Sequence, residues 1–236
     1  MELIARAAMR RWISHSSRAR FQWSSLISHL DAARMRRALC SAASRRALLG
    51  APDASLVGAV RGGTGDALPP APDVQIWPEI ISETEESALV AEAERWLARR
   101  AFEPGHFDNV IRNYREQQQP LGRVREPSRA LLQKLSAAAV PGAELLPVHV
   151  LELAADGSIG RHVDHVEYSG GTIAGLSLVS SAVMTLHHEG TDAALDLTLP
   201  PRSLYALSGA ARYEWGHSLV PAGRRIAMLF RDRAET

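Results

Sequence analysis

The stretch LLPVHVLELAADGSIGRHVD, residues 145–164, begins a run of short apolar or alternating segments that decides the fold. Gly, Pro, Asp or Ser separates most of these segments, which is typical of strands joined by turns. The eight predicted strands cover residues 145–153, 158–163, 172–180, 183–188, 194–199, 203–208, 211–217 and 225–231. Eight short strands at this spacing predict a double-stranded β-helix, or jelly roll.

Two helices are predicted ahead of these strands. The sequence SETE at residues 82–85 fits a capping box, which opens a helix that runs to about Arg100. Pro127 suits the first position of a second helix, whereas residues 101–126 are polar and are predicted to be irregular. The predicted fold class is therefore mainly β with N-terminal helices: a jelly roll of about eight strands preceded by two helices.

Length and composition exclude several classes of protein. With 236 residues, 46% of them hydrophobic, the chain can bury a sizeable core, so disorder of the whole chain is excluded. No stretch reaches the roughly 18 apolar residues that a membrane span needs. The single cysteine, Cys40, excludes an internal disulfide and a thiolate metal cluster.

The two ends of the chain differ in charge. Residues 1–72 hold eleven Arg, no Lys and four acidic residues (+7), whereas residues 73–236 hold 16 basic and 22 acidic residues (−6). The Arg-rich, acid-poor residues 1–50 predict a mitochondrial transit peptide, recognised by the import machinery and leading to the matrix. A plastid presequence, a disordered basic tail or a nucleic-acid-binding arm are the alternatives. Residues 51–72 are rich in turn formers and predict a linker, which leaves 73–236 as the folded domain.

Three residues form a candidate metal site. His162 and Asp164 end a predicted strand at positions i and i+2, so both side chains point to one face. His217 closes a later strand, and a jelly roll brings strands that are distant in sequence together. Two histidines and one carboxylate form the facial triad of non-haem Fe(II) oxygenases. A surface strand with two polar side chains is the alternative explanation of the His-x-Asp pair alone.

The last predicted strand, RRIAMLFRD, suggests a partner for the metal. Arg225 and Arg231 are six residues apart and share one face, while the apolar residues between them at even positions face the other way. Arginines on the inward face need anions, and the dicarboxylate 2-oxoglutarate could fill two iron positions while its far carboxylate meets a guanidinium. Arg225 is predicted for this contact, and Tyr205 could add a hydrogen bond. Its neighbour Arg224 has the opposite parity.

Three segments together resemble the AlkB family of Fe(II)/2-oxoglutarate dioxygenases. They are HVDHVEYSGGTIAGLSL (162–178), SLYALSGAARYEWGH (203–217) and RRIAMLFR (224–231). The resemblance extends from about residue 76 to residue 231 and points to the mitochondrial branch linked to programmed necrosis. It implies Fe(II), 2-oxoglutarate and O2 as reactants. The site residues that it implies are His162, Asp164 and His217 for iron, and Tyr205, Arg225 and Arg231 for 2-oxoglutarate.

The sequence departs from the nucleic-acid repair members of that family. Those members keep an Asn and a Tyr where this chain has Leu151 and Leu153, and an Asn where it has Ala227. The acidic net charge of residues 73–236 also differs from the basic footprint of nucleic-acid-binding domains. The resemblance therefore implies hydroxylation coupled to 2-oxoglutarate decarboxylation on a protein or metabolic target, by a monomer with a role in programmed necrosis or mitochondrial metabolism. A mitochondrial RNA demethylase acting on N-methyl bases and a non-enzymatic metal-binding jelly roll are the alternatives.

Overall fold

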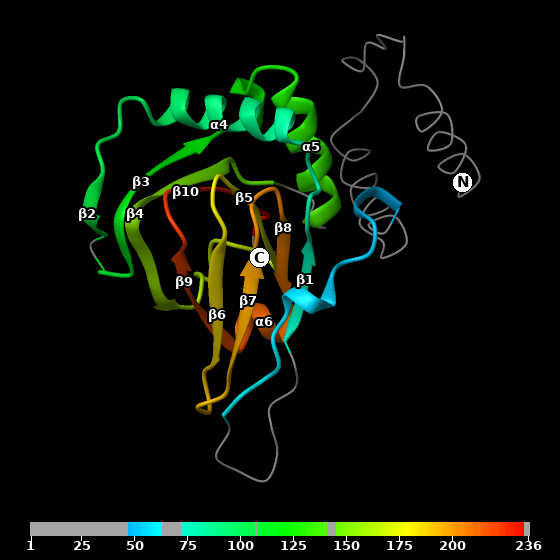
Figure 1. The fold of residues 1–236 in the computed structure, drawn as a ribbon, viewed down its shortest axis with the longest axis vertical. Coiled ribbons are helices and arrows are strands. Elements are labelled where there is room, and N and C mark those ends of the chain that lie inside the picture. Colours follow the sequence, from blue (N-terminus) through cyan, green and yellow to red (C-terminus); the bar gives the residue numbers. More distant parts are fainter. Residues whose placement is uncertain (1–46, 63–71, 107, 141–144, 234–236) are drawn as a thin grey trace. The chain divides into compact units, whose positions relative to one another are not determined.

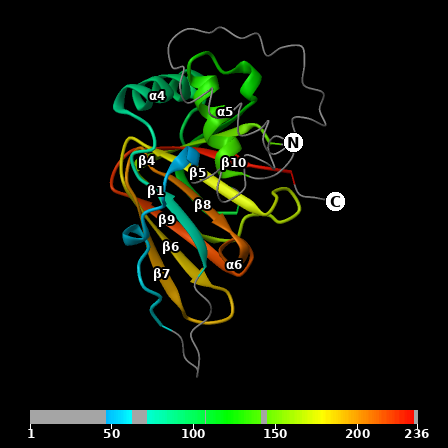
Figure 2. The same cartoon turned by 90° about the vertical axis from the view of Figure 1, so that its right-hand side faces the viewer.

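The computed structural model describes residues 47–62, 72–106, 108–140 and 145–233. Ten antiparallel strands form one sheet that turns back on itself, and helices α4 and α5 cover one side of it (Figure 1, Figure 2). In chain order the elements are η1 (Ala54–Leu56), β1 (Asp73–Trp77), α4 (Glu83–Leu97), β2 (Glu103–Gly105), β3 (Ile111–Gln119), η2 (Leu121–Arg123), α5 (Ser128–Ala139), β4 (Val148–His162), β5 (Thr172–Leu178), β6 (Ala182–His188), β7 (Ala194–Leu199), β8 (Leu204–Ser208), α6 (Gly209–Tyr213), β9 (Trp215–Pro221) and β10 (Arg225–Arg231). The mainly β jelly-roll class is confirmed.

Strands that are distant in sequence are neighbours in the sheet. The order of hydrogen-bonded strands is β1-β8-β5-β10-β4-β9-β6-β7, while β3 pairs with β4 and β2 pairs with β3. Strand β4 joins two parts of the sheet: Leu153 lies opposite Arg225 of β10, and His162 lies opposite His217 of β9. The chain therefore brings the C-terminal strand and the end of β4 to one interior.

Two hydrophobic clusters lie on the two sides of this sheet. Helices α4 and α5 bury their apolar faces against β4, β5 and β10, where Met228 and Phe230 belong to the same cluster. The second cluster lies on the opposite face of these strands, inside the fold, and includes Leu186 of β6 and Trp215 of β9. The outer cluster holds the helices against the sheet. The inner face of the sheet carries the second cluster and also the polar residues of the cavity described below.

The two predicted helices are present. The Ser82 hydroxyl accepts a hydrogen bond from the Glu85 amide (3.2 Å), and the Glu85 carboxylate accepts one from the Ser82 amide (2.8 Å), so the predicted capping box is confirmed. Helix α5 begins at Ser128, with Pro127 in the preceding cap position. None of the helices in the part of the chain described here is long and apolar enough to cross a membrane.

Four predicted segments differ from the structure. The segments 145–153 and 158–163 form one strand, β4, because the intervening ADG sequence is accommodated by a register shift against β3. Residues 101–126, predicted to be irregular, contain β2 and β3. Most side chains of β3 are only half-buried, so the strand can form from the polar sequence IRNYREQQQ, which lacks the apolar pattern of a buried strand. The segment 211–217 is not a strand throughout: α6 ends at residue 213 and β9 begins at residue 215.

Residues 47–62 pack against the sheet. Leu49 belongs to the outer hydrophobic cluster, and Val57 and Arg61 pair with Leu197 and Ala194 of β7. Part of the predicted linker thus contributes contacts to the fold. The predicted transit peptide, residues 1–50, lies almost entirely outside the described residues, and its boundary stays a prediction.

Candidate active site

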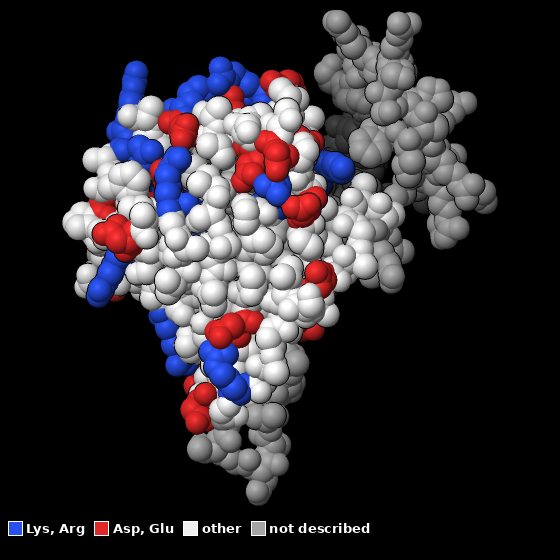
Figure 3. Space-filling view, in the orientation of Figure 1, with Lys and Arg blue, Asp and Glu red and all other residues white. Residues whose placement is uncertain are grey.

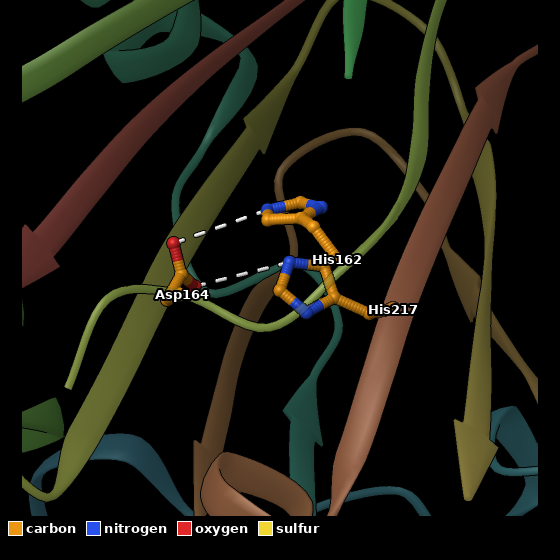
Figure 4. A group of neighbouring side chains, drawn as sticks. All are labelled: His162, Asp164 and His217. Atoms are coloured by element: carbon orange, nitrogen blue, oxygen red, sulfur yellow. Dashed lines mark ion pairs between the residues drawn. The ribbon is translucent and has the colours of Figure 1, made fainter. Parts of the chain in front are cut away.

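Two histidines and one aspartate meet at the end of β4 (Figure 4). His162 is the last residue of β4 and lies opposite His217, while Asp164 follows two residues beyond the strand. One ligand atom of each residue lies within 4.8 Å of the other two. The Asp164 carboxylate oxygens are 4.0 Å from His162 Nε2 and 3.9 Å from His217 Nε2, which is too far for hydrogen bonds. The structure thus brings the predicted three together, with Asp164 in a loop rather than on a strand.

The main chain selects the tautomer of His162. Its Nδ1 lies 3.0 Å from the carbonyl oxygen of Gly160. Because a carbonyl can only accept, Nδ1 carries the proton and donates it. The lone pair of Nε2 then faces Asp164 and His217, as it does in metal-binding histidines that are oriented by a second hydrogen bond.

The electrostatic environment favours the forms of these groups that bind metals. Burial lowers the pKa of His217 to about 4, although the nearby Asp164 opposes the shift, so the ring is neutral at pH 7. Burial acts to raise the pKa of Asp164, but its electrostatic interactions with His217, His162, Arg231 and Arg212 outweigh burial, and the pKa of Asp164 is lowered. A neutral imidazole and an ionised carboxylate are the states that ligate a metal ion.

A cavity of about 80 Å³ lies beside this triad. Tyr205, Arg225 and Arg231, the three residues predicted to hold a cosubstrate, all line it, and so does His149. The rest of its lining is apolar, with Ile111, Leu151, Ile159, Met184, Leu207 and Leu219 among its residues. The structure therefore places all six predicted site residues around a single cavity.

Arg225 is a buried cation with an incomplete set of partners. Its side chain lies among the fully buried ones, at 1% exposure, and its Nε and Nη2 donate to the Ser177 hydroxyl at 3.2 and 2.7 Å. No carboxylate in the described residues forms an ion pair with it. Burial lowers the pKa of Arg225, yet an arginine side chain stays protonated in proteins. A buried guanidinium of this kind is stabilised when an anion enters the cavity.

Tyr205 lies across β5 because its cross-strand neighbour is a glycine. Gly175 pairs with Tyr205, and a Cβ at Gly175 would lie 2.5 Å from the tyrosine hydroxyl oxygen. Any larger residue would displace the ring. Burial raises the pKa of Tyr205, with Arg225 opposing the shift, so its hydroxyl keeps its proton at neutral pH and can donate to a carboxylate.

Arg231 is held by a residue that the sequence analysis did not name as part of the site. Its Nη2 donates to His149 Nδ1 at 2.7 Å, and His149 Nε2 then donates to the Glu116 carboxylate at 2.6 Å. His149 is half-buried and hydrogen-bonded, and it also lines the cavity. The sequence could have indicated this position, because His149 and Leu151 are two residues apart on β4 and therefore face the same side of the strand.

Arg224 lies on the opposite side of the strand. Its guanidinium donates to Glu152 at 2.6 Å and to Glu94 at 2.7 Å. Glu152 is 1% exposed, so Arg224 neutralises a buried carboxylate outside the cavity. The parity predicted for Arg224 and Arg225 therefore agrees with their surroundings.

These groups fit a metal with an anionic cosubstrate. Two imidazoles and a carboxylate supply three ligands on one side of an ion and suit Fe(II) with open positions. The unpaired guanidinium of Arg225 suits a carboxylate, to which it can donate two parallel hydrogen bonds. The donor set and the charge of the cavity thus define a non-haem iron oxygenase site.

Comparison with known proteins shows to which family this chain belongs. A sequence model of the 2OG-Fe(II) oxygenase superfamily matches residues 106–233, which are more than half of the chain and include all six site residues. The chain belongs to this superfamily. It is a 2-oxoglutarate-dependent dioxygenase, with Fe(II) as cofactor and 2-oxoglutarate as cosubstrate. The alternative of a non-enzymatic jelly roll is wrong.

Within the superfamily the chain is of the AlkB homologue 7 type. It is 42% identical over 173 residues to "Alpha-ketoglutarate-dependent dioxygenase alkB homolog 7, mitochondrial" of Bos taurus, covering 67% of this chain and 77% of the bovine protein. The Mus musculus protein of the same name is 41% identical over 175 residues, covering 68% of this chain and 78% of the mouse protein. A prolyl-4-hydroxylase of Pseudomonas putida shares the fold, with a TM-score of 0.53, 17% identity, and coverage of 69% of this chain and 94% of that chain.

Proposed function

We propose that this dioxygenase hydroxylates a C–H bond of a protein side chain or a small metabolite in the mitochondrial matrix. In this proposal the triad holds Fe(II), and Arg225 anchors 2-oxoglutarate with help from Tyr205 and Arg231. The observation that carries the proposal is the position of Arg225, a buried guanidinium without a carboxylate partner in the described residues, on the same cavity as the triad. Fe(II) with 2-oxoglutarate and O2 supplies the oxidative chemistry, in which succinate and CO2 form and one oxygen atom enters the substrate.

Each cavity residue has a distinct part in this proposal. Arg225 donates a bidentate pair of hydrogen bonds to the far carboxylate, and Tyr205 adds one donor to the same group. Arg231, oriented by His149, contributes a second positive charge to the cavity. The apolar lining limits water, which strengthens these interactions and protects the reaction from hydrolysis.

The apolar lining also supports a substrate that offers an aliphatic or methyl C–H bond. Apart from the triad and the groups assigned to 2-oxoglutarate, the cavity presents hydrocarbon side chains such as Ile111, Ile159 and Leu219. A site of this kind selects by shape and apolar contact. The face in Figure 3 shows basic and acidic side chains intermixed, rather than the continuous basic stripe of a nucleic-acid groove.

The RNA demethylase alternative has less support from strand β3 and the residues beside it. Tyr114 of β3 is 1% exposed, so its ring is not available to stack on a base. Arg115 pairs with Glu152 at 2.7 Å and lies 4.8 Å from the centre of the Phe102 ring. Both side chains are committed to contacts inside the protein, whereas base-flipping enzymes use free aromatic surfaces.

The cellular setting is proposed from the N-terminal composition and from the relatives. We propose that residues 1–50 are recognised by the mitochondrial import machinery, that the matrix form is a monomer, and that its target acts in mitochondrial metabolism or programmed necrosis. A fluorescent fusion to residues 1–70 should then enter mitochondria. Cytosolic fluorescence in intact cells would contradict the location, and survival unchanged by loss of the gene during necrotic stress would contradict the role.

One assay separates the substrate classes. The full-length protein is supplied with Fe(II), 2-oxoglutarate and O2, and succinate is measured after addition of protein, small-molecule or RNA fractions of a mitochondrial extract. We expect stimulation by the protein or small-molecule fraction, with the Asp164→Ala variant as the inactive control. Stimulation by the RNA fraction alone would favour the demethylase alternative. Absence of any 2-oxoglutarate-dependent succinate would contradict the proposed site.

A further inference from the structure

Arg212 of α6 holds the loop that carries Asp164. It is 3% exposed, and its guanidinium donates only to main-chain carbonyl oxygens of this loop. Nη1 donates to Asp164 at 2.9 Å, Nη2 donates to His165 at 3.2 Å and to Ser169 at 3.3 Å, and Nε donates to Gly170 at 3.2 Å. One side chain thus contacts four carbonyls of the segment that follows β4.

Few other hydrogen bonds hold the loop of residues 163–171 among the residues that the structure describes. Residues 163–171 belong to neither a helix nor a strand, so the sheet does not fix the main chain at Asp164. At the far end, the Gly170 amide donates to the Asp232 carbonyl at 3.0 Å. A Cβ at Gly170 would lie 2.3 Å from the Asp232 carboxylate, so this close approach requires glycine. Arg212 is therefore the side chain that connects the Asp164 end of the loop with its anchored end.

Arg212 has no carboxylate partner among the described residues, although it is buried. A guanidinium in this position is usually paired with an acid, whereas here four carbonyl dipoles satisfy it. The arginine does not line the cavity, so it is placed to act on the metal ligand rather than on the cosubstrate.

We propose that Arg212 is a positioning residue for the metal centre, which fixes the main chain at Asp164 so that its carboxylate faces His162 and His217. This inference rests on the proposed iron site. Groups that orient metal ligands from outside typically contribute about 10- to 100-fold to metal affinity. Loss of Arg212 should therefore weaken Fe(II) binding by about that factor.

The test is an anaerobic Fe(II) titration of the full-length protein. Arg212→Ala should bind Fe(II) about 10- to 100-fold more weakly than the parent, and the visible spectrum of its Co(II) form should change because the carboxylate is no longer held. Dilute guanidinium chloride, well below denaturing concentrations, should partly restore the affinity by occupying the vacated space. Arg212→Lys keeps the charge but has too few donors for four carbonyls, so its affinity should be intermediate.

Arg115→Ala is the matched control. Arg115 also joins elements by donating to carbonyls, those of Leu97 and Arg100, but it contacts neither the loop nor the cavity. Its loss should lower the melting temperature and leave Fe(II) affinity and the Co(II) spectrum unchanged. An equal loss of Fe(II) affinity in this variant would show a general effect of destabilisation and overturn the inference.

The remaining outcomes separate this inference from the proposed function. If the parent does not bind Fe(II), or Asp164→Ala binds it normally, the proposed metal site fails. If the parent binds Fe(II), Asp164→Ala does not, and Arg212→Ala binds it with parental affinity, only the positioning role is overturned. Should Arg212→Ala fail to fold, Arg212→Lys decides the question, and parental affinity with an unchanged spectrum would contradict the proposal.

Discussion

Strand β10 presents Ile226, Met228 and Phe230 to the helices on one side and Arg225 and Arg231 to the cavity on the other. The apolar side chains find all their packing partners within the protein, since they are at most 2% exposed and belong to one cluster with α4 and α5. The cavity face holds two cations without an ion-pair partner in the described residues. One strand thus supports stability with one face and reserves the other for a ligand.

Arg224 and Arg225 show the same contrast between neighbours in the chain. Arg224 points away from the cavity and pairs with Glu152 and Glu94, so the protein satisfies its charge. Arg225 points inward and finds only neutral partners. The residue type alone therefore does not identify a cosubstrate anchor. A buried arginine without a counter-charge, on a strand whose other side chains are packed, does identify one.

The largest expected effect comes from removing a ligand of the triad. His162→Ala or Asp164→Ala should abolish Fe(II) binding and 2-oxoglutarate turnover, because two remaining ligands cannot hold the ion with useful affinity. The far-ultraviolet circular dichroism should remain that of the parent, since neither side chain belongs to a hydrophobic cluster. Metal analysis and succinate formation provide the measurements. A His162→Ala protein that makes succinate at the parental rate would contradict the triad.

The next effect concerns the cavity face of β10. Removing one partner of a buried charge pair costs about 3–5 kcal/mol, and each 1.4 kcal/mol is about tenfold. Arg225→Ala should therefore raise the KM for 2-oxoglutarate by more than about a hundredfold. Arg225→Lys should lie between this variant and the parent, because lysine keeps the charge without the fork geometry. Equal KM values for the lysine variant and the parent would show that charge alone is sufficient.

A smaller effect is expected at Tyr205. Tyr205→Phe removes one hydrogen bond to a charged group, worth about 1.5–3 kcal/mol, and leaves the ring packed over Gly175. The affinity for 2-oxoglutarate should fall about 10- to 100-fold, less than in Arg225→Ala. Calorimetric titration of the metal-loaded protein measures this, and a larger loss than in Arg225→Ala would reverse the assigned roles.

The smallest effect on cosubstrate binding should come from the apolar face. Met228→Ala removes a fully buried side chain and should lower the free energy of unfolding by about 2–5 kcal/mol. Its effect on 2-oxoglutarate affinity should be negligible, because Met228 does not line the cavity. Denaturant unfolding and the same calorimetric titration measure the two quantities. Weakened cosubstrate binding in a folded Met228→Ala protein would break the separation of the two faces.

Local periodicity explains what the sequence could predict. The two faces of β10 follow from the period of two in RRIAMLFR, and the start of α4 follows from hydrogen bonds within residues 82–85. Both features depend on residues a few positions apart. The triad residues could also be predicted, because His162 and Asp164 are two residues apart and His217 lies in a later predicted strand of a fold that brings distant strands together.

Features that depend on distant contacts were missed. Asp164 was placed on a strand by parity, yet it lies in a loop held by Arg212, 48 residues later in the sequence. The alternating pattern around Arg212 suggested a strand, whereas Gly209, with a φ of +50°, lets the chain leave β8 and form α6. Strand β3 was missed because its polar side chains carry no periodic signal, and its existence depends on pairing with β4.

The most direct test is a titration of 2-oxoglutarate into the anaerobic Fe(II) form, followed by its metal-to-ligand absorption band, in the parent, Arg224→Ala and Arg225→Ala. We expect tight binding to the parent and to Arg224→Ala, and binding weakened by more than about a hundredfold in Arg225→Ala. Circular dichroism of each variant checks that the fold is retained. Parental affinity in Arg225→Ala together with a large loss in Arg224→Ala would contradict the assignment of the cavity face.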